Sequence, residues 1–151
     1  MSPDSARASA SPLDGLLRVA TPADIGPMFR VRYAVQENTL RPGRIDDEDV
    51  RAQIVDSGRG WVVECDGQVV AFAIGNASDG NVWALFVDPP FHGRGFGSRL
   101  HDAMVDWLWS RGLTALWLHT GKGTRAQEFY ERRGWRAVGE VGTEIRYELH
   151  R

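Results

Sequence analysis

The residues best placed to do chemistry are three glycines at alternate positions, Gly93, Gly95 and Gly97. They follow an apolar run over 82–87, typical of a buried strand, and precede a helical pattern over 98–111. The first amides of a helix have no partner within it, and the helix dipole favours negative charge there. Glycine lets the backbone turn sharply and approach a ligand closely. The stretch therefore predicts a site for a phosphate-bearing ligand.

The spacing of these glycines excludes two common phosphate-binding motifs. A dinucleotide fingerprint, G-x-G-x-x-G, counted from Gly93 would place its third glycine at Ser98. A P-loop, G-x-x-x-x-G-K-[ST], does not occur in the chain. The stretch 92–97 instead resembles the acetyl-CoA pyrophosphate loop, [RQ]-x-x-G-x-[GA], of the GNAT family of N-acetyltransferases. His92 stands where the family has Arg or Gln, which changes one side chain and leaves the backbone amides in place.

A second segment, over 124–135, is similar to another signature of the same family, N-x-x-A-x-x-F-Y-E-x-x-G-[FW]. Gly123 replaces the usual Asn. The matching positions, in order, are Ala126, Phe129, Tyr130, Glu131, Gly134 and Trp135. Two separate motifs in the family's order indicate the family far more strongly than the glycine loop alone, which a chain with 17 Gly could contain by chance.

The resemblance implies acetyl-CoA as co-substrate, and a single cysteine gives no metal cluster, so no metal is expected. It implies that the strand before the glycine loop and the next strand splay apart, so that backbone groups of Leu85 and Val87 hold the pantetheine arm while amides of the loop hold the pyrophosphate. Both residues are also candidates for plain core positions. The expected acetyl-CoA-binding residues are Leu85, Phe86, Val87, His92, Gly93, Arg94, Gly95, Phe96, Gly97, Ser98, Thr124, Ala126, Phe129 and Tyr130.

Acetyl transfer from a thioester to an amine needs a neutral amine and a proton for the leaving thiolate. By resemblance, Tyr130 is the general acid; the alternative is an aromatic residue packed under the sheet. The strand over 81–87 has no acid at which to place a general base. His119 is the candidate base, since histidine titrates near neutral pH, although a solvated histidine at a strand end is the more common case. Asp79, Asp88 and Glu37, a backbone carbonyl with water, and an amine of low pKa that needs no base remain alternatives.

The composition limits which class of protein the chain can belong to. A chain of 151 residues with 42% hydrophobic and 25% charged residues is typical of one globular domain. Its Ser-, Ala- and Pro-rich start predicts a disordered tail over 1–14, followed by a single domain over 15–151. Cys65 is the only cysteine, which excludes an internal disulfide. Together with the lack of an apolar stretch long enough for a membrane span or a leader, this favours a cytoplasmic protein. A net charge of −2 argues against nucleic acid as a partner.

The apolar periodicity predicts the order β-α-α-β-β-β-α-β-α-β-β. This is an α/β fold with a mixed, mostly antiparallel central sheet of about seven strands flanked by about four helices, and it agrees with the acyl-CoA N-acyltransferase fold that the resemblance implies. The expected strands are 16–19, 61–65, 69–74, 82–87, 113–118, 137–141 and 144–149, and the expected helices are 22–38, 46–57, 98–111 and 124–133.

These observations favour an acetyl-CoA-dependent N-acetyltransferase that acts on a primary amine of a small molecule, a peptide N-terminus or a lysine. A non-catalytic acyl-CoA sensor on the same fold is the alternative, because a fold does not fix a function. Because the fourth strand has no acid, the sensor remains an alternative, whereas the presence of Tyr130 favours the enzyme. Homodimers are frequent in the family, so a homodimer is a further expectation by resemblance.

Overall fold

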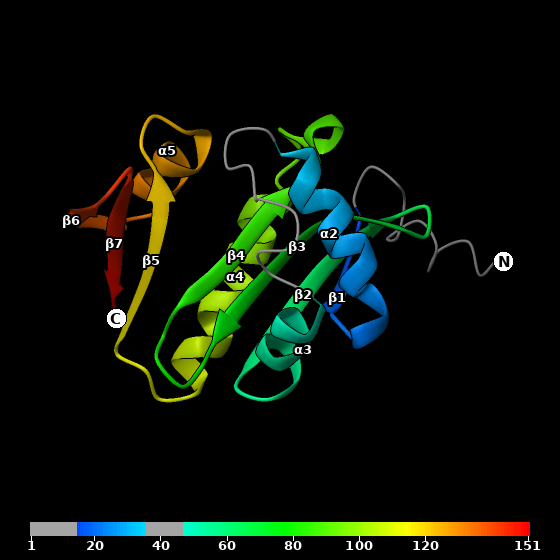
Figure 1. Ribbon diagram of the computed structural model, residues 1–151, viewed down its shortest axis with the longest axis horizontal. Helices are drawn as coiled ribbons and strands as arrows, with labels where there is room; N and C mark the ends of the chain where they lie inside the picture. The colour runs from blue at the N-terminus through cyan, green and yellow to red at the C-terminus, as the bar shows by residue number, and fades with distance from the viewer. Residues whose placement is uncertain (1–14, 36–46) are drawn as a thin grey trace, which may run out of the picture.

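The computed structural model describes residues 15–35 and 47–151. Within them, the expected α/β fold with mostly antiparallel strands is confirmed, and the elements follow the expected order (Figure 1). The tail predicted over 1–14 lies outside the described residues. The elements are β1 (Leu16–Val19), α2 (Ile25–Ala34), α3 (Asp47–Val55), β2 (Gly58–Cys65), β3 (Gln68–Asn76), β4 (Val82–Val87), α4 (Phe96–Ser110), β5 (Ala115–Gly121), α5 (Arg125–Arg132), β6 (Arg136–Val141) and β7 (Glu144–His150).

The strands form two sheets, one with the order β1-β2-β3-β4 and one with the order β5-β7-β6. Neighbouring strands in both sheets are antiparallel. The sheets meet at an isolated parallel bridge between Asn81 and Trp117, just before β4. Beyond this bridge β4 and β5 diverge toward α5 (Figure 1). A gap between the two sheets is therefore part of the architecture.

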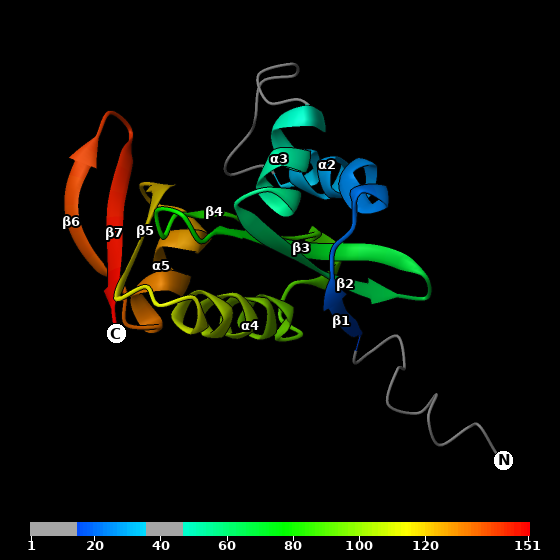
Figure 2. The same cartoon turned by 90° about the horizontal axis from the view of Figure 1, so that it is seen from below.

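Helices cover both faces of the larger sheet. Figure 2 shows α2 and α3 on one face and α4 on the other. The strand β3 is buried on both faces: Phe72 and Ile74 pack with the core under α2 and α3, and Ala71 and Ala73 pack with the core under α4. An apolar run without alternation, such as β3, is what two covered faces require.

The observed helix boundaries correct two expectations. The first helix ends at Ala34, because Val35 is extended, with φ −84° and ψ 115°. Its expected end at residue 38 lies outside the described residues. The helix after the glycine loop starts at Phe96, two residues earlier than expected, with Gly95 as its N-cap. The loop is thus shorter, and its glycines lie directly at the helix terminus. Among the described residues, none of the helices has both the length and the apolar character that crossing a membrane requires.

Candidate active site

The first component of the site is the open edge of β4. The N–H of Asp88 donates to the carbonyl of Val70 at 2.8 Å, and backbone groups along an antiparallel strand alternate between its two edges. The N–H and C=O groups of Leu85 and Val87 therefore point away from β3 and toward the gap. These are the two residues from which a pantetheine-binding edge was expected.

The glycine loop follows β4 and turns into α4. Gly93 and Gly95 have φ of 80° and 82°, in the left-handed region that other residues adopt only with strain. A Cβ added at either position would meet no heavy atom within 4 Å, so the space over the loop is open. The first residues of α4, Phe96, Gly97 and Ser98, present N–H groups that have no partner one turn earlier. An open loop with unpaired amides fits a pyrophosphate.

His92, the position where the chain departs from the family pattern, binds the protein itself. Its Nε2 lies 2.8 Å from the carbonyl oxygen of Val87. A carbonyl only accepts, so this ring nitrogen is the donor. The imidazole ties the loop back to the end of β4. It also occupies the Val87 carbonyl, which leaves the Leu85 groups and the Val87 N–H at the open edge.

Two other residues expected at the cofactor have side chains that pack elsewhere. Phe96 is buried in the core, with its ring 6.4 Å from that of Phe91, so only its backbone can face a ligand. The Arg94 guanidinium lies over the Phe91 ring, 4.9 Å from the centroid. Most of the expected residues surround a groove of about 510 Å³, called here the loop groove. The expected residues that line it are Leu85, Phe86, Val87, His92, Gly93, Gly95, Phe96, Gly97, Ser98, Ala126, Phe129 and Tyr130.

The helix α5 forms the far wall of the loop groove. Thr124 is its N-cap, and its Oγ1 accepts from the N–H of Gln127 at 3.2 Å. The same hydroxyl donates to the carbonyl of Gly121 at 2.9 Å. The side chain of Thr124 therefore fixes the turn between β5 and α5. Thr124 lies away from the loop groove and lines the second groove, described below.

Tyr130 lies where the two grooves meet. It lines both of them and is 5% exposed. Burial raises the pKa of its hydroxyl well above the usual value for tyrosine. Desolvation penalises the phenolate, so the hydroxyl keeps its proton. A buried, protonated phenol beside two open grooves can serve as a proton donor.

Contacts between α4 and the residues that directly follow α5 hold Tyr130 in place. The Nε1 of Trp135 donates to Nε2 of His101 at 3.0 Å. The other ring nitrogen of His101, Nδ1, lies 3.0 Å from an Asp102 oxygen, and Arg133 binds the same oxygen. The rings of Tyr130 and Trp135 meet edge-on at 5.5 Å. These bonds fix the orientation of the helix that carries the tyrosine.

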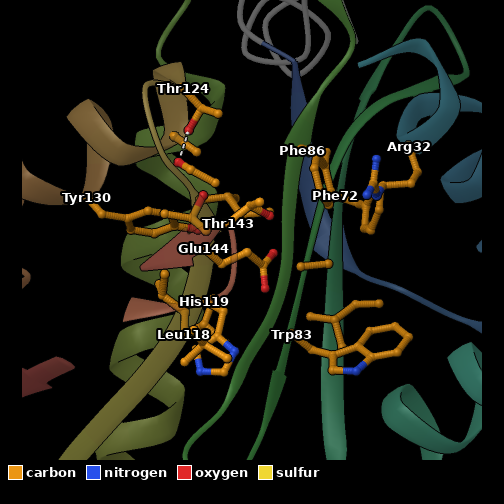
Figure 3. Close-up of a pocket in the computed structure, with 18 of the residues that line it drawn as sticks. Arg32, Phe72, Trp83, Phe86, Leu118, His119, Thr124, Tyr130, Thr143 and Glu144 are labelled. Atoms are coloured by element: carbon orange, nitrogen blue, oxygen red, sulfur yellow. Dashed lines mark hydrogen bonds between the residues drawn. The ribbon is translucent and has the colours of Figure 1, made fainter. Parts of the chain in front are cut away.

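The second groove has a volume of about 850 Å³ and lies along the gap between the sheets; it is called here the sheet groove. Its walls come from α2, β4, β5 and the turn before β7. Figure 3 shows Tyr130, His119 and Glu144 on one side of β4, and Arg32, Phe72 and Phe86 on the other. Charged groups thus lie at both sides of an aromatic floor.

His119 lines the sheet groove and is exposed, with its ring centroid 5.3 Å from that of Trp117. It is the one predicted base that the structure places there. Asp79 accepts from the N–H of Asn81 at 2.9 Å, and buried Asp88 pairs with Arg30 at 3.0 Å. Neither lines the sheet groove as described. Glu37 lies outside the described residues.

Sequence reasoning missed two charged residues of the sheet groove, Glu144 and Arg32. Glu144 pairs in register with Gly121 of β5, and its carboxylate points into the gap in Figure 3. The hairpin pattern over 137–149 could have placed Glu144 at a strand end, but only the pairing of β7 with β5 brings it to the groove. Arg32 had no sequence signal that distinguished it from Arg30 on the same helix.

Comparison with known proteins agrees with this geometry. The acetyltransferase (GNAT) family model matches residues 27–135. The chain is 34% identical over 84 residues to the mycothiol acetyltransferase of Beutenbergia cavernae, a match that covers 52% of this chain and 28% of that protein. It is 32% identical over 73 residues to the [ribosomal protein bS18]-alanine N-acetyltransferase of Haemophilus ducreyi, covering 46% of this chain and 50% of that protein. The matches therefore span half or less of these curated relatives.

Solved structures share the whole fold. The N-acetyltransferase PaiA of Thermoplasma acidophilum, solved in complex with coenzyme A, aligns with a TM-score of 0.79 at 13% identity, over 91% of this chain and 99% of that chain. A GNAT-family acetyltransferase of Staphylococcus aureus aligns with a TM-score of 0.78 at 16% identity, over 90% of this chain and 98% of that chain. With the family model covering most of the described residues, the two motifs and the fold lead to one conclusion: the chain belongs to the acetyltransferase (GNAT) family.

Proposed function

We propose that this protein is an acetyl-CoA-dependent N-acetyltransferase that transfers an acetyl group directly to a primary amine. The observation that carries the proposal is the position of Tyr130, a protonated phenol where the loop groove meets the sheet groove. One groove offers unpaired amides to a pyrophosphate, and the other offers charged and aromatic groups to a second substrate. A site with two grooves that share one proton donor suits a reaction between two substrates.

In this proposal, separate groups of the chain bind the thioester and donate the proton. Loop amides and the Leu85 backbone hold and orient the thioester at the open edge of β4. The amine nitrogen forms a bond to the acetyl carbon, and the bond from that carbon to sulfur breaks. Tyr130 gives its proton to the departing sulfur, which avoids release of a free thiolate. Because burial keeps Tyr130 protonated, it is ready to donate at neutral pH.

The amine must lose a proton before or during the attack. We assign this step to His119, acting directly or through water, because it lines the sheet groove and a neutral imidazole has a ring nitrogen that can accept a proton. Glu144 lies in the same groove and would attract the ammonium form of the amine. One relative is named as an N-acetyltransferase of a ribosomal-protein alanine. The acceptor classes therefore include a peptide N-terminus as well as a lysine and a small amine.

The test is isothermal titration of acetyl-CoA into the wild-type protein and into Gly95→Glu. Gly95 is a loop residue with φ +82° and open space around it, so a glutamate would put a carboxylate where the pyrophosphate is held. Gly67→Glu is the matched control. It has φ +75° and the same open surroundings but lies in the turn between β2 and β3, so it carries the same backbone strain without touching the site.

Micromolar binding by wild type and Gly67→Glu, with loss in Gly95→Glu, would support the loop as the acetyl-CoA site. A screen of amines, read by release of free thiol, then tests the transfer. Binding without acetylation of any amine would favour the acyl-CoA sensor. Failure of the wild-type protein to bind acetyl-CoA would refute both functions.

A further inference from the structure

Two arginines of α2 differ in how their charges are satisfied. Arg30 pairs with Asp88 at 3.0 Å through Nη1 and donates to the carbonyl of Val69 through Nη2. Arg32 is different: its Nη1 is buried and has no hydrogen-bond partner among the described residues. Buried donors in native proteins are almost always paired. Arg32 is thus an exception: the described residues supply no partner for this donor.

Arg32 lies in the wall of the sheet groove. Its guanidinium carbon is 4.5 Å from the centroid of the Phe86 ring, and Figure 3 shows it beside Phe86 and Phe72. Stacking uses the flat face of a guanidinium, whereas its N–H groups lie in the plane and stay available. Burial also lowers the pKa of Arg32, because desolvation penalises the cation. A bound anion would offset that penalty.

We propose that Arg32 binds a carboxylate of the amine acceptor, so that the protein acetylates amines that also carry an acidic group. The inference rests on the proposed function, whose acceptor class it narrows. Arg32 lies on the opposite side of β4 from Tyr130 and Glu144 (Figure 3). The acceptor would cross the aromatic floor of Phe86, with its amine on the side of Tyr130 and its acid at Arg32. A planar fork of N–H donors matches the two oxygens of a carboxylate.

The test compares acceptors that differ only in charge. One set is a series of ω-amino acids from β-alanine to ε-aminocaproate, each paired with its carboxamide. The other is a short peptide with a free N-terminal alanine and either Glu or Gln next to it. For at least one pair we expect kcat/KM for the acid to exceed that for the amide by at least about tenfold, the size of one hydrogen bond to a charged group. The difference should lie mainly in KM, because Arg32 binds and does not react.

Substitutions of Arg32 distinguish loss of carboxylate binding from loss of folding. In Arg32→Gln, kcat/KM for the acid and kcat/KM for the amide should differ by no more than about twofold, since the charge of Arg32 accounts for the preference. Arg32→Glu should reverse the preference and favour matched diamines over the amino acids, an outcome that simple misfolding cannot produce. The control is Arg59→Gln. Arg59 also stacks on an aromatic ring, 5.0 Å from the centroid of Trp107, but it does not line either groove.

The outcomes distinguish this inference from the proposed function. Equal use of acids and amides by the wild type, or a ratio unchanged in Arg32→Gln, would overturn the role of Arg32 while leaving the acetyltransferase in place. The same holds if the wild type acetylates only amines outside these pairs. If acetyl-CoA does not bind, the proposed function fails first and the inference fails with it. Titration of each acid and amide into the protein with CoA present gives the same comparison without turnover.

Discussion

At the scale of single residues, burial decides what Tyr130 can do. A solvated tyrosine is a weak acid that loses its proton near pH 10. In this site the phenolate is penalised by desolvation, so the pKa is raised and the proton is retained over the whole working range. The same residue packs edge-on against Trp135. The catalytic and the packing interpretations of Tyr130 are therefore compatible.

Tyr130→Phe keeps the ring and removes only the proton donor. We expect kcat to fall at least about tenfold, within the usual range for loss of a general acid, with little change in acetyl-CoA binding. Because the pKa of Tyr130 is raised, wild-type kcat should show no decline from tyrosine ionisation up to about pH 10. Steady-state kinetics across pH measures both.

The matched control is Tyr147→Phe, since the hydroxyl of Tyr147 donates to Glu131 at 2.6 Å and neither residue lines a groove. This variant should lose about 1 kcal/mol of stability from the missing hydrogen bond and retain its kcat. Unchanged turnover in Tyr130→Phe would remove Tyr130 from the mechanism.

At the scale of elements, the site depends on how α5 is docked onto α4. His101 accepts from Trp135 at Nε2, so its proton is on Nδ1, toward Asp102. In this arrangement the neutral imidazole has a partner at each nitrogen. Burial lowers the pKa of His101, and a bond to Asp102 opposes the shift only in part. Protonation at Nε2 would cost the bond to Trp135.

This arrangement predicts a pH-dependent stability. The folded pKa of His101 lies below the unfolded value of about 6.5, so the unfolded chain binds the proton more readily. Stability is therefore complete above about pH 6.5 and falls as the pH drops through the folded pKa. We expect His101→Gln to reduce this decline, as measured by Tm between pH 7.5 and pH 5.

The control for this prediction is His150→Gln, because His150 is an exposed histidine at the end of β7. It should leave the acid decline in Tm unchanged. An equal decline in wild type and His101→Gln would mean that other groups cause the loss of stability in this pH range.

At the scale of the whole molecule, the gap between the two sheets creates the sheet groove. The sheets touch where Trp117 N–H donates to the carbonyl of Gly80 at 3.0 Å and Asn81 donates to the carbonyl of Trp117 at 3.3 Å. Gly80 has φ +78°, and a Cβ there would lie 2.7 Å from the carbonyl oxygen of Ala115. The close approach of the sheets at this seam thus requires glycine.

Gly80→Ala should therefore destabilise the protein by more than the roughly 1–2 kcal/mol that left-handed backbone costs a residue with a side chain. Gly112→Ala isolates that backbone cost, since Gly112 has φ +92° and no atom within 4 Å of an added Cβ. Urea unfolding gives the free energy of unfolding of both variants. The difference between their losses measures the cost of the steric clash where the two sheets meet. Equal destabilisation would show that the backbone alone accounts for the effect.

Local sequence patterns were enough to predict the order of the elements, the glycine loop and the position of Tyr130 in its motif. These are local properties: periodicity, turn residues and helix caps act over a few neighbouring residues. The strand Val82–Val87 was predicted with its exact ends because apolar residues fill it between a turn and two prolines. The boundaries of α2 and α4 differ from the predicted ones because a helix end is set by backbone conformation, as at Gly95 and Val35.

Tertiary packing, in contrast, sets which distant groups share a groove. The pairing of β7 with β5 brings Glu144 to the gap, and the packing of α2 on the larger sheet buries Arg32 over Phe86 while Arg30 finds Asp88. Such contacts join residues far apart in the chain, so no local pattern specifies them. Desolvation is also a property of the assembled fold: it raises the pKa of Tyr130, and it leaves Nη1 of Arg32 without a described partner.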